Sequence, residues 1–124
     1  MEQLILHLIG DYVTQTDWMA RRKTHRLWIA ALHALIYSLP FFLLSPSWLA
    51  VLVIFSTHVV IDRYRVARFV IYAKNKITDP GLSWADASAT GHHKDTPEWM
   101  AFWLLILVDN TMHLAINYSA LRWL

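Results

Sequence analysis

Pairs of histidine and aspartate placed four residues apart are the side chains in this sequence best suited to chemistry. Three such pairs occur: His7 with Asp11, His58 with Asp62, and Asp109 with His113. Residues at i and i+4 share one face of a helix, so each pair can offer two metal ligands, or an acid and a base together. The spacing alone carries little weight, because seven histidines and nine acidic residues in 124 positions give about one such pair by chance. Their setting is more informative, since all six lie in apolar segments that other ionisable residues largely avoid.

Imidazole nitrogens and carboxylate oxygens are typical ligands of zinc, and also of manganese, iron and nickel. The chain has no cysteine, so thiolate ligands are excluded. A lone histidine in another apolar segment brings the candidate ligands to seven: His7, Asp11, His33, His58, Asp62, Asp109 and His113. Because a catalytic zinc uses three protein ligands and an open position, seven would supply two metals, or one metal and the residues that orient its ligands. We therefore expect a divalent metal, with zinc as the first choice, and expect His25, His92 and His93 in polar sequence to be surface histidines.

The apolar segments that position these residues predict an all-α, integral membrane four-helix bundle with three to four membrane-embedded helices. Hydrophobic residues make up 56% of the chain, and no charged residue occurs from Leu27 to Ser56. Ser45-Pro46-Ser47 divides that run into two segments, and Asp109 is the only formal charge from residue 99 to residue 121. The expected helices of this single domain, 1–124, cover residues 3–20, 25–44, 47–73 and 97–121, with a polar loop at 74–96.

The distribution of basic residues predicts the orientation of these helices. Clusters at 21–26 and 63–76 place those segments on the cytoplasmic side and residues 45–47 on the other side. Gly10 should let a neighbouring helix approach closely, and Pro40 should kink the second helix. A net charge of +2 does not favour nucleic acid, so membrane lipid is the expected partner, with homo-oligomerisation as a further possibility.

The stretch His7–Ala20, HLIGDYVTQTDWMA, resembles the opening of the domain of unknown function 3307 family, small membrane proteins of bacteria and phages. The resemblance covers most of the chain outside residues 74–96, at Lys23, His33, Tyr37, residues 56–62, Asp109, Asn110 and His113. Asn110 stands where the family more often has glutamine. More distantly, the layout is similar to that of YdjM-like membrane-bound metal-dependent hydrolases. The resemblance implies a protein of the bacterial inner membrane.

We therefore expect a metal-dependent hydrolase acting on a lipid-linked or phosphate ester. A bound metal would lower the pKa of a water molecule, with Asp62 or Asp11 as general base. No GxSxG motif is present, which favours activated water over a covalent intermediate. Further roles are expected for two groups of residues: Lys23, Arg63 and Arg65 would hold an anionic headgroup, and Gln15, Tyr37 and Asn110 would orient the ligands.

Two other hypotheses use the same polar faces. A carboxylate within a bilayer costs about 2.5–3.5 kcal/mol on insertion scales, so these side chains must face each other, water or an ion. In a non-enzymatic membrane protein, such as a pore, lysis or host-interaction factor, they would join helices or copies of the chain. In a proton or ion pathway they would carry the ion.

Overall fold

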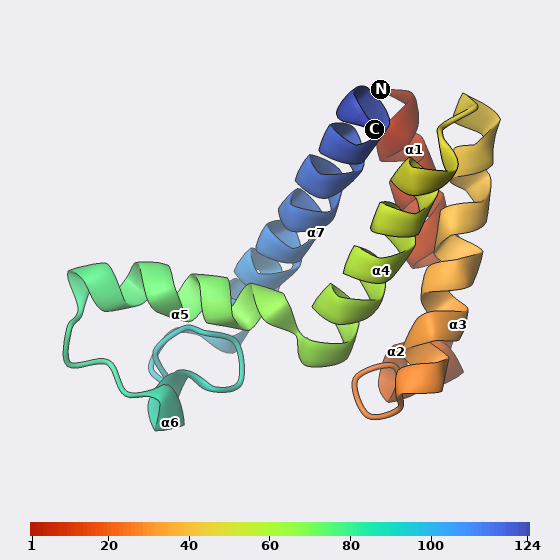
Figure 1. Ribbon diagram of the computed structural model, residues 1–124. Coiled ribbons are helices and arrows are strands. Elements are labelled where there is room, and N and C mark those ends of the chain that lie inside the picture. Colours follow the sequence, from red (N-terminus) through yellow and green to blue (C-terminus); the bar gives the residue numbers. More distant parts are fainter. The chain divides into compact units, whose positions relative to one another are not determined.

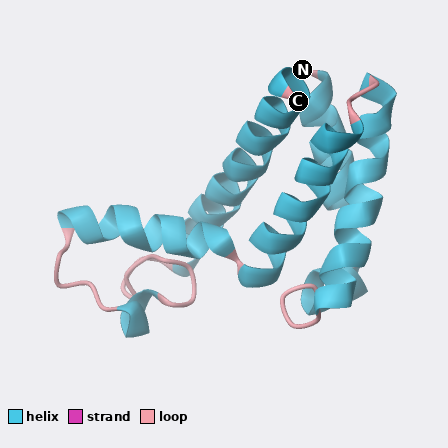
Figure 2. Ribbon diagram, in the orientation of Figure 1, coloured by secondary structure: helices cyan, strands magenta, loops and turns pink.

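All 124 residues are described in a computed structural model, in which every regular element is a helix and no strand occurs (Figure 1, Figure 2). The prediction of an all-helical protein is confirmed. The chain forms two compact units: the first comprises residues 1–64 and 113–124, and the second comprises residues 65–112. The long helix α7, Glu98–Trp123, contributes its C-terminal part to the first unit and its N-terminal part to the second.

In the first unit, the predicted helix over 3–20 is divided into three pieces. These are α1 (Glu2–Leu8), a π-helical turn η1 (Ile9–Val13) and α2 (Asp17–Arg22). The division is local in origin, because Thr16 adopts an extended conformation and its side chain caps α2 by accepting a hydrogen bond from the Met19 amide at 3.3 Å.

The next two helices of the first unit are α3 (Leu27–Ser38) and α4 (Trp48–Tyr64), which lie side by side (Figure 1). Between them, α3 tightens into a 3₁₀ segment, η2 (Leu39–Leu44). Pro40 lies at the start of η2, where its ring and missing amide hydrogen disfavour continuation of the α-helix. Ser45 then takes a left-handed conformation and ends the segment.

The core of the first unit receives side chains from five elements. Its buried residues are Leu6, Tyr37, Phe41, Ala50, Ile54 and Ala120. The expected close approach at Gly10 is confirmed, because a Cβ there would lie 2.6 Å from Cδ2 of Tyr37. Glycine at this position lets η1 pack directly against α3.

The predicted helix over 47–73 is broken at Arg65, whose φ of 52° is left-handed. The remainder becomes α5 (Val66–Thr78) of the second unit, which is followed by the short helix α6 (Trp84–Ala87). The interval 74–96, expected as a polar loop, thus contains the end of α5 and all of α6. Side chains of α5 donate hydrogen bonds to carbonyls of this interval, including Arg68 to Ser88 and Asn75 to Gly91.

Two helical stretches are long and apolar enough to cross a membrane, Leu27–Leu44 and Glu98–Trp123. The other two helices expected in a membrane are shorter, since α1 has seven residues and α4 has 17. By length and composition, therefore, the structure offers two candidate spans where three to four membrane-embedded helices were expected, and the four-helix membrane bundle stays a prediction.

Candidate metal centre

Four of the seven candidate ligands converge in the first unit. Asp11 comes from η1, His33 from α3, and His58 and Asp62 from successive turns of α4. All four are buried, and one ligand atom of each lies within 4.8 Å of the ligand atoms of the others. These four residues, called the His/Asp cluster below, can hold a metal ion.

Five of the six distances between the donor atoms of the cluster lie between 3.0 and 3.6 Å. Nε2 of His33 lies 3.0 Å from Nε2 of His58, 3.1 Å from Oδ1 of Asp11 and 3.3 Å from Oδ2 of Asp62. Nε2 of His58 lies 3.6 Å from Oδ1 of Asp11 and 3.2 Å from Oδ2 of Asp62. Ligands at zinc distances of about 2.0–2.2 Å stand about 3.3–3.6 Å apart in a tetrahedron. The spacing in the cluster therefore suits a small divalent ion.

Two further histidines lie beside the outer oxygens of the two carboxylates. Nε2 of His7 lies 3.8 Å from Oδ2 of Asp11, and Nε2 of His113 lies 3.4 Å from Oδ1 of Asp62. Each aspartate thus has one oxygen facing the cluster and one facing an outer imidazole. These are the positions from which residues around a metal site commonly orient its ligands.

Tyr37 connects the outer histidines to the packing of the unit. Its hydroxyl lies 2.8 Å from Nδ1 of His7 and accepts a hydrogen bond from Nδ2 of Asn117 at 2.6 Å. Its ring stacks on the ring of His58 with centroids 3.8 Å apart. Tyr37 was expected to support the site, whereas Asn117 was not among the expected site residues. Its proximity to the site could have been predicted from the sequence, because Asn117 follows His113 by four residues and so shares its face of α7.

The π-helical turn sets the position of Asp11. Within it, the Thr14 amide donates to the carbonyl of Ile9 at 2.9 Å, which is one residue further back than in an α-helix. The Thr14 hydroxyl donates to the carbonyl of Gly10 at 2.9 Å and so occupies the widened turn. Such single turns occur frequently at functional sites, where they re-aim a side chain.

Lys23 reaches into the cluster from the end of α2. Its Nζ donates to Oδ2 of Asp62 at 2.6 Å and lies 3.5 Å from Nε2 of His33 and 3.9 Å from Oδ1 of Asp11. Two buried carboxylates require a positive partner, and this ammonium supplies one. The sequence placed Lys23 among headgroup-binding residues and contained no signal that it would lie between the ligands.

The other expected site residues lie outside the cluster. In the first unit, the Arg63 guanidinium donates to the carbonyl of Thr24 at 2.5 Å, and Gln15 is half-buried. In the second unit, the Arg65 guanidinium donates to the carbonyl of Ala89 at 2.9 Å. Also in the second unit, Asp109 is half-buried on α7, and the Asn110 amide donates to the carbonyl of Ile106 at 3.0 Å on the same helix.

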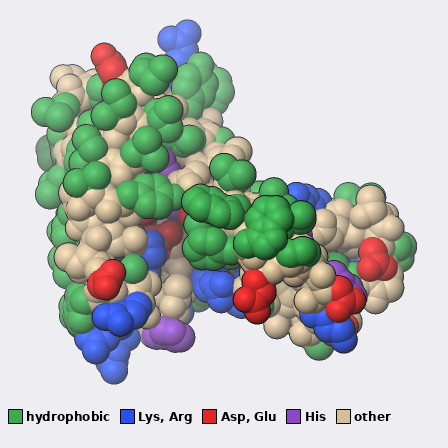
Figure 3. Space-filling model, turned by 180° about the vertical axis from the view of Figure 1, so that it is seen from behind, with side chains coloured by type: hydrophobic (Ala, Val, Ile, Leu, Met, Phe, Trp, Pro, Cys, Tyr) green, Lys and Arg blue, Asp and Glu red, His purple; other side chains and the backbone are tan.

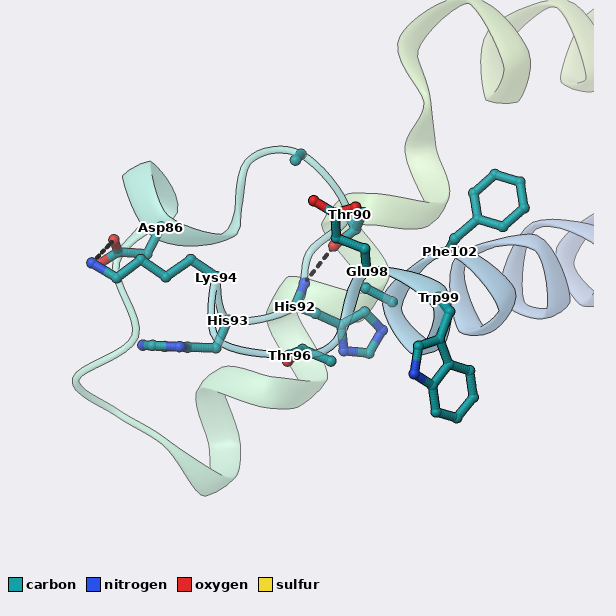
Figure 4. A pocket seen from close by; sticks show the side chains of 11 residues that line it. Asp86, Thr90, His92, His93, Lys94, Thr96, Glu98, Trp99 and Phe102 are labelled. Atoms are coloured by element: carbon teal, nitrogen blue, oxygen red, sulfur yellow. Dashed lines mark hydrogen bonds and ion pairs between the residues drawn. The ribbon is translucent and has the colours of Figure 1, made fainter.

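The second unit contains a cavity of about 630 Å³ beside the start of α7 (Figure 4). Its rim includes the ion pair of Lys94 with Asp86 at 3.0 Å. A hydrogen bond from the Ser83 hydroxyl is the main cause that lowers the pKa of Asp86, and Lys94 lowers it further. Asp86 in turn raises the pKa of Lys94. His92 also lines this cavity. It is buried, so the prediction that His92 is a surface histidine was wrong.

The environment of His92 favours its neutral form. Its Nδ1 lies 3.3 Å from the amide nitrogen of Asn75, which donates to it. Burial lowers the pKa of His92, and the charge of Lys74 lowers it further. By contrast His25, the histidine expected at the surface of the first unit, is exposed.

Comparison with known proteins identifies one family. The model of one family, described as "Protein of unknown function (DUF3307)", matches residues 1–118. These residues include the whole His/Asp cluster and its outer histidines. No curated protein and no solved structure matches the chain. The match covers nearly the entire sequence, and the chain therefore belongs to the DUF3307 family.

Proposed function

We propose that this protein is an integral membrane protein in which the His/Asp cluster binds a divalent metal ion, with zinc as the best fit, and hydrolyses a lipid-linked or phosphate ester. The convergence of Asp11, His33, His58 and Asp62, with one buried ligand atom of each within 4.8 Å of the others, is the observation that carries the proposal. A bound ion would offset the two buried carboxylates, because metal affinities reach about 10 kcal/mol or more. The weaker resemblance to YdjM-like membrane-bound metal-dependent hydrolases, and an origin in bacteria or phages, form part of the same proposal.

The distribution of apolar surface supports the membrane part of the proposal. Along α3 and η2, Leu35, Leu39 and Leu43 form an outward-facing stripe with exposed fractions of 52%, 54% and 80%. Hydrophobic side chains also cover much of the face of the first unit seen in Figure 3. Water would disfavour such a surface on a monomer, whereas lipid would solvate it.

Basic residues support an orientation within the bacterial inner membrane. Arg21, Arg22 and Arg26 are exposed at the end of the first unit that carries α2, where basic side chains gather in Figure 3. We assign this end to the cytoplasmic face by the positive-inside rule. Lys23 extends from the same end to the cluster, with 15% of its side chain exposed, so we place substrate entry there.

The chemical roles follow from the number of donors. A catalytic zinc keeps one position open, so we assign His33, His58 and Asp62 as ligands and leave the fourth position to water. The metal supplies a more acidic water and a positive charge for the scissile group. Asp11 then serves as general base, while Lys23 and the basic residues of α2 hold the anionic part of the ester.

Metal analysis tests the binding part of this proposal. The purified wild-type protein should contain about one divalent ion per chain after reconstitution with zinc. The double variant His58→Ala/Asp62→Ala should contain none, and His25→Ala, which removes an exposed histidine, should match the wild type. If the wild type takes up no stoichiometric zinc, manganese, iron or nickel, the proposed metal centre is wrong.

Ester hydrolysis tests the catalytic part separately. Release of phosphate from phosphatidic acid and from para-nitrophenyl phosphate should be slowed at least about a hundredfold in Asp11→Asn, since general base catalysis contributes about that much. The same variant should retain its metal. If the wild-type protein binds metal but hydrolyses neither ester, the catalytic part of the proposal is wrong and the metal has a structural role.

A proton pathway is the second candidate, and one observation favours it. Polar contacts of 3.9 Å or less connect Lys23 through Asp11 and His7 to Tyr37 and Asn117. Chains of this kind are typical of proton relays in membrane proteins. In that case Asp11→Asn would abolish pH-driven proton flux into liposomes, and removal of metal would have no effect on the flux.

A further inference from the structure

An apolar stripe runs along the outer face of α5 in the second unit. Its residues recur at spacings of three and four positions: Val66, Phe69, Val70, Ala73 and Ile77. The exposed fractions of Phe69, Val70 and Ile77 are 45%, 43% and 81%. The indole of Trp84 stacks on Phe69 with ring centroids 4.9 Å apart and widens the same surface.

The opposite face of α5 is held by its own unit. Ala67 and Ile71 are buried. The Tyr72 hydroxyl donates to the carbonyl of Leu82 at 3.2 Å, and the Asn75 amide donates to the carbonyl of Gly91 at 3.1 Å. These bonds fix the rotation of the helix, so the apolar stripe cannot turn inward.

The charged residues of the segment that carries the stripe all have one sign. Five basic residues and no acidic residue occur from residue 63 to residue 78: Arg63, Arg65, Arg68, Lys74 and Lys76. At 100° per residue, Lys74 lies on one side of the stripe and Lys76 lies on the other. Both are exposed, although the Lys76 ammonium also donates a hydrogen bond to the carbonyl of Leu82 at 2.7 Å. An apolar stripe flanked on both sides by long basic side chains is typical of helices that lie in the plane of a membrane surface.

We propose that α5 is such an in-plane helix, with its apolar stripe in the acyl boundary and its flanking basic residues on the headgroups of anionic lipids. The inference uses the proposed membrane location but does not depend on the metal centre. It adds a second, peripheral contact with the bilayer to the two candidate spans, and it assigns the partner of this surface as an anionic phospholipid.

The charge and size of the stripe favour a bilayer over a second copy of the chain. Two copies packed through α5 would bring two all-basic segments together, which is unfavourable. A helix of 13 residues also offers a face only about 20 Å long and 10 Å wide, well below the roughly 800 Å² per partner of a stable interface. A bilayer has no such size requirement and supplies negative charge.

Site-directed spin labelling of the full chain in lipid nanodiscs tests the proposal. The chain has no cysteine, so each introduced cysteine is the only one. A nitroxide at Ile77→Cys should collide more with oxygen, which dissolves in lipid, than with a water-soluble nickel chelate. Ala85→Cys is the matched control, because Ala85 is exposed on α6 of the same unit. A label there should show the opposite preference.

Lipid composition tests the charge part of the inference. The fraction of α5 bound to the bilayer is read from the accessibility of the Ile77→Cys label to oxygen and to nickel. This fraction should be higher in discs containing phosphatidylglycerol than in discs of phosphatidylcholine alone. Lys74→Gln/Lys76→Gln should reduce that preference about fivefold for each lysine removed. Equal binding in both lipids would overturn the assignment to anionic lipid. Equal nickel accessibility at Ile77 and Ala85, or spin–spin broadening between labels on different copies, would overturn the in-plane helix itself.

Discussion

Nζ of Lys23 lies 2.6 Å from Oδ2 of Asp62, the same carboxylate oxygen that lies 3.3 Å from Nε2 of His33 and 3.2 Å from Nε2 of His58. The lysine ammonium therefore occupies the side of this oxygen where a metal ion would bind. In this arrangement a side chain of the same protein offsets one of the two negative charges of the cluster. Under the proposed function, metal uptake requires the ammonium to withdraw, so that Lys23 and the metal would compete for Asp62.

Replacing the ammonium with an apolar group should strengthen metal binding. In Lys23→Met the competing charge is absent while the length of the side chain is kept, so zinc affinity should rise at least about tenfold. Isothermal titration of the metal-free protein with zinc measures this change. Lys76→Met, a lysine substitution in the second unit, should leave the affinity unchanged. An unchanged or weaker affinity in Lys23→Met would show that the ammonium does not compete.

The hydroxyl of Tyr37 should contribute to stability through its two buried partners. Tyr37→Phe removes the group that bonds to Nδ1 of His7 and to Nδ2 of Asn117. Loss of a partner from a buried polar group costs about 1–3 kcal/mol, so the Tm in detergent should fall. Tyr118→Phe, at an exposed tyrosine of the same unit, serves as control. Equal Tm values for both variants and the wild type would contradict the assigned role.

Gly91 should tolerate no side chain. Its φ is +85°, and a Cβ there would approach the carbonyl oxygen of Arg68, lie 2.7 Å from Cβ of Ile71 and lie 2.9 Å from the amide nitrogen of Tyr72. Gly91→Ala should therefore separate residues 88–93 from α5 and increase hydrogen exchange in both. Gly81→Ala is the matched control, because the nearest atom to its Cβ would be a side-chain oxygen of Asp79 at 3.4 Å. Equal exchange in the two variants would refute the packing argument.

The second unit should lose stability in acid because of His92. Its pKa is lowered in the folded protein by burial and by Lys74, so the unfolded chain binds a proton more readily than the folded chain does. The contribution of His92 to stability is thus present above its ordinary pKa of about 6.5 and is lost as the pH falls below that value. Hydrogen exchange of α5, corrected for its intrinsic dependence on pH, should increase on acidification. His92→Gln should remove this increase, and His93→Gln should retain it.

Several features of the site follow from local sequence. The four-residue spacing places His58 and Asp62 on one face of α4, and their Nε2 and Oδ2 atoms lie 3.2 Å apart. The absence of charge around His33 predicts its burial, and Gly10 predicts the close approach of η1 to α3. The DUF3307 family is also identifiable from sequence motifs, and the match over residues 1–118 confirms it.

Other features depend on contacts between segments far apart in the chain. The four-residue spacing of Asp109 and His113 does not show that Nε2 of His113 also lies 3.4 Å from Oδ1 of Asp62, which is 51 positions away in the sequence. Nor does the spacing show that Lys23 enters the cluster. The break at Arg65 carries no glycine or proline signal, so the amphipathic pattern predicts a helix that continues through it.

Helical periodicity and hydrophobicity thus determined which side chains share a face and which segments avoid water, because both depend on neighbours along the chain. The packing of η1 and α3 against α4 and the end of α7 decided which oxygen of Asp11 and Asp62 faces the His/Asp cluster and which faces an outer histidine. It also decided which cation lies between the two carboxylates. These choices depend on distances of a few ångströms between separate helices, which no spacing along the sequence specifies.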